Sequence, residues 1–476
     1  MDNDVAEKMA VHLTGALDVP VQTTTVVRGS SLRQLVLMLD EALGERGTPL
    51  STQLPNWRRP SVSQHDVLQN PAAYLPTIPH TFLIEGQLNV RTFLQAVEQV
   101  IDLHPILRTR YKCVDGLTGS RTEPGARAAV SFEDVRGPAA EARLRAWALD
   151  RSMVRFHYGM SPLADFSLRR FDDRLYGFSL VITHLICDGW SIENLMADIS
   201  RNILEATGAG EGASSVDPKD PLDWAEEQQA FAISPAADTL VDRWKARLGH
   251  DPAVLEVTLP QWTGLDSGAP RESSRYLSRA DEDAVRAYAR TQRATLFTVF
   301  AAATAYSFKE ASGPRLVPIY TSFANRRTRA EGRMVTWASG GIYVPVHVGA
   351  DDTTGSLLRQ TQIATAQSMK DGRLSMWHVR RAIWPYDLGS ARGPTSLVVN
   401  VNRPRAGGLV LPGVKVAHVP VPPTGTVRGL TLWVNDIPGR LSLQLLSPAD
   451  AYPAQIQEAF LESICRTVLA TARAAQ

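Results

Sequence analysis

The sequence predicts a layered α/β protein made of two similarly built halves. Segments with the period of strands alternate with segments with the period of helices, and this order starts near residue 78 and again near residue 275, as expected where helices pack on sheets. A strongly apolar strand at 174–185 is expected at the buried centre of one sheet. Because domains average roughly 150 residues, the 476 residues suit about three units, or two large ones with an appendage.

Residues 1–58 are expected to form a helical appendage and a linker. The segments 4–17 and 31–44 place apolar side chains at the spacing of amphipathic helices. Residues 45–60, ERGTPLSTQLPNWRRP, contain the turn and breaker residues of a linker. The first lobe therefore begins near residue 59, and we assign residues 59–240 to it.

The first lobe opens with a predicted strand and helix. The strand starts at residue 78 (HTFLIEGQ), and the helix at 88–105 has Asn89 as its N-cap. After the apolar strand at 174–185, the Gly-, Ser- and Pro-rich stretch 207–221 predicts a surface loop. A further helix is expected at 223–232, in DWAEEQQAFA.

The second lobe, residues 241–476, repeats this pattern. It begins with a strand-like segment at 276–278 and a helix at 281–292, followed by an apolar helix at 296–311. The remaining predicted elements are strands at 316–323, 340–348, 395–402, 430–436 and 440–446 and a closing helix at about 453–474.

Composition and motifs exclude several functional classes. Fifty basic residues against 49 acidic ones leave a net charge of +1, which provides no field to attract nucleic acid or anionic lipid. Cys113, Cys187 and Cys465 form no CxxC pair, so neither a disulfide framework nor a zinc site is expected. The start MDNDVAEKM lacks a signal peptide's bases, and no apolar run is long enough to span a bilayer. We expect a cytoplasmic protein that binds no membrane, no nucleic acid and no metal.

The candidate chemistry lies in HLICDG, from His184 to Gly189. A histidine at the end of a buried strand, beside an Asp-Gly turn, lies where α/β folds expose side chains to a crevice. A neutral imidazole with a pKa near 6.5 can accept a proton at neutral pH. The alternative is a structural histidine held inside the turn. No HExxH, GxxxxGK[ST] or GxGxxG in a strand-turn-helix setting supports other chemistry.

The segment VITHLICDGWS resembles the HHxxxDG signature of the condensation domains of nonribosomal peptide synthetases, in the chloramphenicol-acetyltransferase-like acyltransferase superfamily. Other family motifs follow in order and spacing: S-x-x-Q at 61–64, LHPILRTRY at 103–111, PLDWAEEQ at 221–228, and the segments 321–346 and 430–452. Two positions depart from the family. Thr183 replaces the first histidine, and IYVP replaces the strand F-V-N-T. Related acyltransferases that use H-x-x-x-D-G alone also lack the first histidine.

The resemblance implies two chloramphenicol-acetyltransferase-like lobes that form a pseudo-dimeric V with a tunnel at their interface. It further implies a free-standing condensation enzyme that transfers an acyl or aminoacyl thioester from a carrier protein to a small-molecule amine or hydroxyl acceptor. The donor carrier protein would deliver the phosphopantetheine arm, and no bound cofactor is expected. One alternative is a CoA-dependent acyltransferase, although the D-F-G-W-G loop of the plant-type enzymes is absent. The other is a catalytically silent domain that recruits partners.

The same resemblance assigns roles to individual residues. His184 is the catalytic base, while Asp188 is expected to support the site by pairing with Arg326 and joining the lobes. Gly189 is interpreted as a turn position that tolerates positive φ or as a point of close substrate approach, with an ordinary turn as the alternative. Trp190 and Ser191 either line the tunnel or stabilise the oxyanion, with packing favoured for Trp190.

The appendage weakly resembles half of a carrier domain. VRGSSL stands in place of the carrier's L-G-G-x-S-L, with Ser31 at the phosphopantetheine position. The third carrier helix has no room before the linker, and Arg28 replaces a small residue. A docking or capping helix pair is therefore favoured over a carrier.

Overall fold

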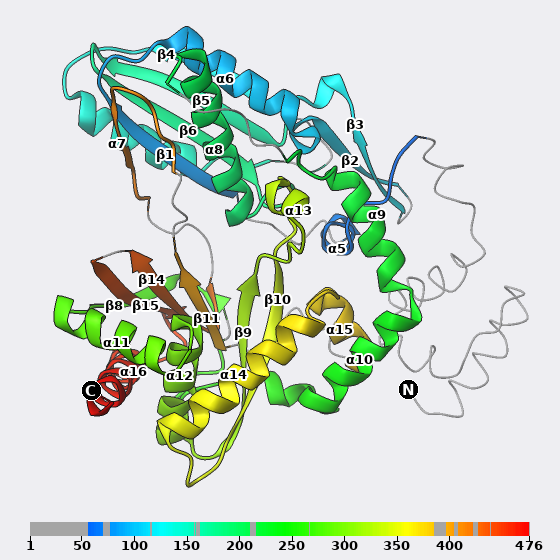
Figure 1. The fold of residues 1–476 in the computed structure, drawn as a ribbon, viewed down its shortest axis with the longest axis vertical. Helices are drawn as coiled ribbons and strands as arrows, with labels where there is room; N and C mark the ends of the chain where they lie inside the picture. The colour runs from blue at the N-terminus through cyan, green and yellow to red at the C-terminus, as the bar shows by residue number, and fades with distance from the viewer. Residues whose placement is uncertain are drawn as a thin grey trace, which may run out of the picture.

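A computed structural model shows the architecture of the chain (Figure 1). It describes residues 56–69, 77–114, 117–156, 158, 162–209, 216–265, 267–384, 397–403, 408–421, 427–437 and 439–475. The two helices expected at 4–17 and 31–44, together with Ser31, lie outside the described residues. Two sheets, each covered by helices, form the two lobes of the α/β fold (Figure 1).

The first lobe is built on a five-stranded sheet. In spatial order its strands are β12 (Lys415–His418), β1 (Thr77–Glu85), β6 (Leu175–Thr183), β5 (Ala164–Asp172) and β4 (Ala129–Asp134). Strand β6 is antiparallel to both of its neighbours, and every residue after Leu175 is buried. The predicted central strand at 174–185 is therefore confirmed.

Helices cover both faces of this sheet (Figure 1). Helix α6 (Val90–Leu103) starts at Asn89, whose side chain accepts a hydrogen bond from the Thr92 amide, as the sequence predicts. It packs beside α8 (Gly189–Ala206), while α7 (Ala140–Ser152) packs against β6 and β1. Apolar side chains from α6, α8 and the sheet form the core of the first lobe.

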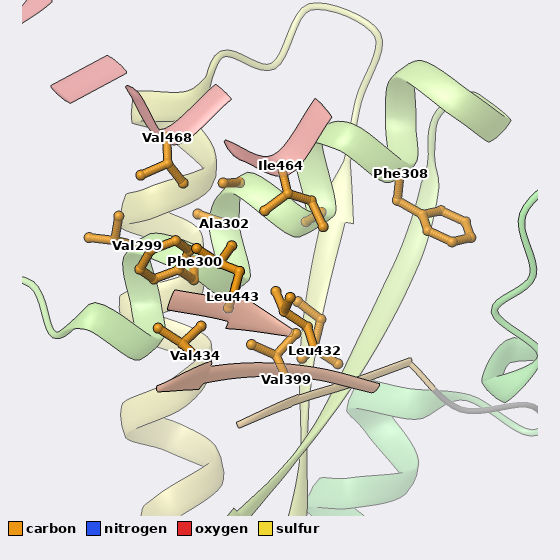
Figure 2. Packing of buried hydrophobic residues seen from close by; sticks show 14 of the residues in the cluster. Val299, Phe300, Ala302, Phe308, Val399, Leu432, Val434, Leu443, Ile464 and Val468 are labelled. Carbon is orange, nitrogen blue, oxygen red and sulfur yellow. The ribbon is translucent and has the colours of Figure 1, made fainter. Parts of the chain in front are cut away.

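The second lobe contains a six-stranded sheet. Its strands in spatial order are β10 (Gly340–Val348), β9 (Arg315–Phe323), β11 (Leu397–Asn402), β14 (Leu430–Ile437), β15 (Arg440–Pro448) and β8 (Pro270–Tyr276). Its helices are α11 (Arg279–Thr291), α12 (Leu296–Ser312), α14 (Thr354–Asp371) and α16 (Ala454–Ala474). Figure 2 shows Phe300 of α12, Leu432 of β14 and Val468 of α16 within one buried cluster.

The second-lobe elements match the sequence expectations at most positions. One expected strand, at 276–278, is displaced: β8 ends at Tyr276, and Ser278 instead caps α11 by accepting a hydrogen bond from the Asp281 amide. A serine hydroxyl at this position satisfies a free amide of the first helical turn. The helix therefore begins directly after the strand.

The described residues also form smaller elements. They are α5 (Val62–Gln69), the 3-10 helices η1 (Pro105–Arg108), η2 (Pro124–Ala126) and η3 (Pro252–Leu255), the hairpin β2 (Thr109–Val114) and β3 (Leu117–Thr122), α9 (Pro221–Ala232), α10 (Pro235–Leu248), α13 (Arg329–Arg333), α15 (Met376–Ile383) and the short pair β7 (Ser267–Gly268) and β13 (Val427–Arg428).

The lobes contact each other in two places. Strand β12, from the C-terminal half of the sequence, pairs antiparallel with β1 of the first sheet, with Phe82 opposite His418. Trp224 of α9 is buried in a cluster with Met334 and Ala338, which lie between β9 and β10. Burial of a large apolar side chain stabilises by about 1.5–3 kcal/mol, so the Trp224 cluster contributes to the contact between the lobes.

Two negative findings apply to the described residues. No helix among them combines the length and the apolar character needed to cross a membrane. They also contain no group of three or more His, Cys, Asp or Glu side chains arranged to hold a metal ion. Cys113, Cys187 and Cys465 are free thiols.

Candidate active site

His184 follows the last residue of β6, in a turn shaped by Thr183. The Thr183 amide donates to the Leu163 carbonyl at 3.1 Å, and this bond extends the pairing of β5 with β6 by one residue. The Thr183 hydroxyl accepts from the Leu185 amide at 3.3 Å, and its carbonyl accepts from the Ile186 amide at 3.2 Å. At the position of the family's first histidine, this chain thus has a buried hydroxyl that fixes the turn carrying His184.

The S-x-x-Q motif supports the same turn from the other side. Gln64, on α5, is buried, and its Oε1 accepts from the Ser61 amide at 2.9 Å. Its Nε2 donates to the Leu185 carbonyl and to the Tyr111 hydroxyl, both at 2.9 Å. The motif therefore ties α5 to the residue that follows His184.

The imidazole of His184 faces an aromatic neighbour and a cavity. Its ring centroid lies 5.1 Å from that of Trp337, with the planes inclined at 65°. Its Nδ1 is buried and has no hydrogen-bond partner among the described residues. Burial lowers the pKa of His184 below 6.5, and this outweighs the opposite effects of nearby backbone groups and the Asp188 carboxylate. The neutral imidazole, which is the proton-accepting form, therefore dominates at neutral pH.

A cavity of about 220 Å³ lies between the lobes, and both contribute to its wall. The first lobe supplies residues 61–63, His184, Trp224, Gln228 and Ala232, and the second supplies Tyr320, Ser322, Asn325 and residues 337–341 and 372–376. The wall contains many polar side chains, and concave sites with convergent polar groups are where proteins bind small substrates. The imidazole is thus accessible from a cavity that neither lobe forms alone.

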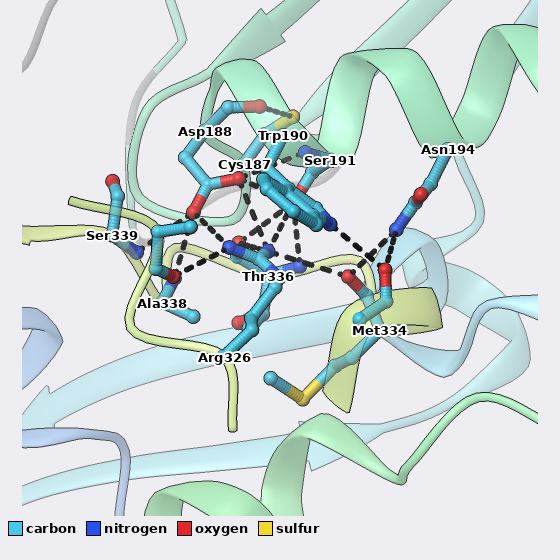
Figure 3. Close-up of polar contacts among 12 residues, drawn as sticks. Cys187, Asp188, Trp190, Ser191, Asn194, Arg326, Met334, Thr336, Ala338 and Ser339 are labelled. Atoms are coloured by element: carbon cyan, nitrogen blue, oxygen red, sulfur yellow. Dashed lines mark hydrogen bonds and ion pairs between the residues drawn. The ribbon is translucent and has the colours of Figure 1, made fainter. Parts of the chain in front are cut away.

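Asp188 is held at the centre of a hydrogen-bond network (Figure 3). Its carboxylate accepts from the amide and hydroxyl of Ser191 at 2.8 and 2.7 Å, as the N-cap of α8. It accepts two bonds from Arg326, at 2.9 and 3.1 Å. The amides of Ala338 and Ser339 donate to it at 3.1 and 2.8 Å. Burial raises the pKa of Asp188, but the Arg326 charge and these hydrogen bonds outweigh burial, and the pKa is lowered overall.

The ion pair of Asp188 with Arg326, implied by the family resemblance, is present and joins the lobes. The two side chains are 2% and 1% exposed. Arg326 also donates to the Ser191 hydroxyl at 2.9 Å and to the Thr336 carbonyl at 3.2 Å. Every acceptor on the carboxylate is thus occupied, so Asp188 is not available to contact substrate and serves as an anchor for both lobes.

Trp190 and Ser191 bridge to the second lobe and do not line the cavity. The Trp190 indole donates to the Gly332 carbonyl at 2.8 Å, and Asn194 donates to the same carbonyl at 2.9 Å. The Ser191 hydroxyl accepts from the Thr336 amide at 3.1 Å. The geometry favours packing for Trp190 over lining a tunnel, and it gives both residues a bridging role between the lobes that the sequence did not suggest.

Gly189 does not have a positive φ, which was one of the alternatives considered for it. It is the first residue of α8, and φ there lies outside the left-handed region. The reason is that Asp188, in extended conformation, caps the helix and leads directly into helical geometry. A Cβ at Gly189 would meet no atom within 4 Å.

Sequence reasoning missed several residues of the cavity. Trp337 lies within the family-like segment 321–346, yet nothing in its local pattern marks it. Tyr320 and Gly341 are neighbours across β9 and β10, where a Cβ on Gly341 would overlap with the Tyr320 hydroxyl. Arg373 lies in a loop that carries no recognised motif. The glycine pair at the start of the predicted strand 340–348 was the one available signal of close packing.

The condensation-domain family model matches residues 64–377, which is more than half of the chain. The chain belongs to the condensation-domain family. The matched range contains the His184 turn, the Asp188 network and almost all of the cavity wall. Condensation domains act on thioesters bound to carrier proteins, and their substrates arrive on peptidyl carrier proteins.

Similarity to known proteins agrees with this membership. The chain is 24% identical over 294 residues to nonribosomal peptide synthetase kk1B of Curvularia clavata, covering 61% of this chain and 2% of that synthetase. It is 23% identical over 317 residues to malpinin synthetase of Mortierella alpina, covering 65% of this chain and 4% of that protein. The chain thus spans a small part of the curated relatives that it matches.

A solved structure has the same fold. The X-domain from teicoplanin biosynthesis superposes with a TM-score of 0.71 at 16% identity, covering 88% of this chain and 96% of the X-domain. This similarity establishes the two-lobed architecture of chloramphenicol-acetyltransferase type for the chain.

Proposed function

We propose that the protein is a condensation enzyme that transfers an acyl or aminoacyl group from a carrier-protein thioester to an amine or hydroxyl acceptor. The observation that carries the proposal is His184, a neutral imidazole on a cavity that both lobes line. Its position on a turn fixed by Thr183 and Gln64 gives the base a defined orientation. Family membership supports a thioester donor.

The proposed reaction is a substitution at the thioester carbonyl. The acceptor nitrogen or oxygen forms a bond to the carbonyl carbon and the carbon–sulfur bond breaks. His184 accepts the proton of the acceptor and returns it to the departing thiolate, so the products are an amide or ester and the thiol of the phosphopantetheine arm. A base positioned in this way contributes about 10²- to 10⁴-fold, part of which comes from orienting the acceptor.

The dependence on His184 differs between acceptors. An α-amine, with a pKa of about 8, is already partly neutral at neutral pH. An alcohol is far less acidic and depends more on removal of its proton. Replacement of His184 is therefore expected to slow ester formation more than amide formation.

A loaded-carrier assay tests the proposal. The wild type and His184→Ala are each supplied with acyl carrier thioester, the matching acyl-CoA and panels of amine and alcohol acceptors, and product is followed by mass spectrometry. The matched control is His347→Ala, because His347 is exposed on β10 and does not line the cavity. Turnover from carrier thioester that is lost in His184→Ala supports the proposal.

The same assay separates the alternatives. Turnover from acyl-CoA alone identifies a CoA-dependent acyltransferase. Carrier binding without turnover of any acceptor identifies a silent recruitment domain. Equal product from wild type and His184→Ala contradicts the role proposed for this histidine.

We also propose the division of the chain into an appendage at 1–58 and lobes at 59–240 and 241–476. For Ser31, the intact mass of the protein after incubation with CoA and a phosphopantetheinyl transferase is the test. No gain in mass supports a docking or capping helix pair, and a gain equal to the phosphopantetheine group identifies a carrier.

A further inference from the structure

The cavity has one permanently charged side chain in its described wall. Arg373 lies on the second-lobe side, and the described lining residues include no Asp and no Glu. His184, the other titratable base, is neutral at neutral pH because burial lowers its pKa. The described wall therefore carries a net positive charge.

No acidic side chain among the described residues neutralises Arg373. The nearby Asp371 is buried and is occupied by Arg243 at 3.0 Å and Arg247 at 2.7 Å. No ion pair or hydrogen bond in the described part of the chain uses the Arg373 guanidinium. A partly buried guanidinium keeps its charge and five donors, so these donors remain for an occupant of the cavity.

The position of Arg373 is fixed by its surroundings. Its guanidinium carbon lies 3.8 Å from the ring centre of Phe231 on α9, in a cation–π contact. The preceding residue, Gly372, ends α14 and passes close to the sheet, because a Cβ there would lie 2.9 Å from both Ile342 and Phe323. The side chain is thus held at the junction of α9, α14 and α15.

The start of α15 adds further donors at the same wall. The lining residues continue through Ser375, the N-cap residue, to Met376, the first residue of the helix. The Ser375 hydroxyl makes no capping bond, and it is buried without a partner among the described residues. The amides of a first helical turn have no partner within the helix, and the helix dipole favours negative charge there.

We infer that the wall formed by Arg373, Ser375 and the start of α15 binds an anionic oxygen group of the substrate, a carboxylate or a phosphate. The inference rests on the proposed acyl transfer, which brings two sources of such a group into the cavity. One is the free carboxylate of an acceptor that is an amino or hydroxy acid. The other is the phosphate of the phosphopantetheine arm. Charge-assisted bonds to a guanidinium are about twice as strong as neutral ones.

Binding experiments test this site without turnover. Melting temperatures of the full chain are titrated with two matched pairs of probes. One pair is 4′-phosphopantetheine and pantetheine, and the other is an amino acid mixture and the same mixture as amides. The variants are Arg373→Gln, which removes the charge, and Arg373→Lys, which keeps it. Arg359→Gln is the matched control, because Arg359 is exposed on α14 and does not line the cavity.

In one pair, the wild type is expected to bind the anionic probe at least about 10-fold more tightly than the neutral probe. This is the gain that one charge-assisted contact provides. Arg373→Gln loses this preference, Arg373→Lys keeps part of it, and Arg359→Gln keeps all of it. The pair that shows the preference identifies the source of the anion. Equal binding within both pairs, no binding of any probe, or an unchanged preference in Arg373→Gln overturns the inference. These binding measurements need no turnover, so failure of the anion site and failure of acyl transfer are distinguishable.

Discussion

The rings of His184 and Trp337 meet at an inclination of 65°, with their centroids 5.1 Å apart. Both neighbours of Trp337 in the sequence belong to the network around Asp188: the Thr336 amide donates to Ser191, and the Ala338 amide donates to Asp188. The carboxylate that caps α8 therefore also holds the indole against the imidazole. The ion pair between the lobes and the position of the proposed base are parts of one arrangement.

Replacement of Trp337 is expected to change the proposed base without unfolding the protein. In Trp337→Ala the imidazole gains contact with water, so its pKa rises toward 6.5 and its orientation loosens. Misplacement of a reacting group by about 1 Å costs on the order of 100-fold, and we expect a fall in kcat of about 10- to 100-fold. Trp337→Phe keeps an aromatic edge and should recover most of the activity. A pH–rate profile that does not move in Trp337→Ala would contradict this role.

Removal of the Asp188 charge is expected to destabilise the protein. Asp188→Asn leaves the buried Arg326 guanidinium without its counter-charge, which typically costs about 3–5 kcal/mol. Activity should be lost through this structural effect. Urea denaturation measures the change in unfolding free energy, with Glu141→Gln as the control, because Glu141 pairs with Arg145 at the surface and exposed pairs contribute about 0–1 kcal/mol. A normal melting temperature together with lost turnover would show that Asp188 acts in the chemistry itself.

The Asp188 carboxylate also gives stability a defined pH dependence. Its pKa in the folded protein is lower than in the unfolded chain, where it is about 3.9. Its contribution is therefore complete above that value and is lost as the pH falls toward the folded pKa. The difference in unfolding free energy between the wild type and Asp188→Asn should therefore become smaller below pH 4. Thermal unfolding of both proteins at pH 3 to 7 measures this difference.

The activity of the wild type should persist below the usual pKa of histidine. Because burial lowers the pKa of His184 below 6.5, the proposed base is still mostly neutral at pH 6.5. We expect the acidic limb of kcat/KM for an alcohol acceptor to be centred below pH 6.5, as measured with a saturating loaded carrier. An acidic limb centred above pH 6.5 would argue against this imidazole as the base.

His104 is expected to make the fold sensitive to acid. Burial, together with the charges of Arg333 and Arg201, lowers the pKa of His104 to about 3, even though its Nε2 lies 2.8 Å from Asp198. Below pH 6.5 the unfolded chain therefore takes up a proton that the folded protein does not, and stability falls by about 1 kcal/mol per pH unit. Between pH 6 and 5, the unfolding free energy of His104→Gln should therefore fall by about 1 kcal/mol less than that of the wild type. Parallel pH curves for the two proteins would refute the prediction.

A methyl group at Gly341 is expected to disturb the cavity. A Cβ there overlaps with the Tyr320 hydroxyl, so the ring must move and the cavity wall changes. Overpacking of this kind costs about 1–3 kcal/mol, and we expect a lower melting temperature for Gly341→Ala together with reduced turnover. Gly355→Ala is the control, because the nearest atom to its Cβ is the Thr353 hydroxyl at 3.9 Å. Equal effects of the two substitutions would exclude a special role for Gly341.

Much of the fold was predictable because its signals are local. The apolar run at 174–185 and the period of residues 296–311 depend only on which side chains face a core, and β6 and α12 follow them closely. Asn89 caps α6 as expected because capping involves side chains within three positions of one another. The prediction of a short strand at 276–278 was wrong in its position. Ser278 caps α11, and the strand-like residues beside it gave no sign of that role.

The sequence by itself determined the two-lobed α/β class, the order of its main elements and the histidine at the end of the central strand. Only the tertiary structure decided which groups surround that histidine. Trp337 and Arg373 are more than 150 positions away from His184 along the chain. Trp337 reaches the cavity because its neighbours bind Ser191 and Asp188, and Arg373 reaches it through its contact with Phe231 on α9. Such a contact leaves no period or spacing in the sequence, because it depends on how two separately folded surfaces fit together.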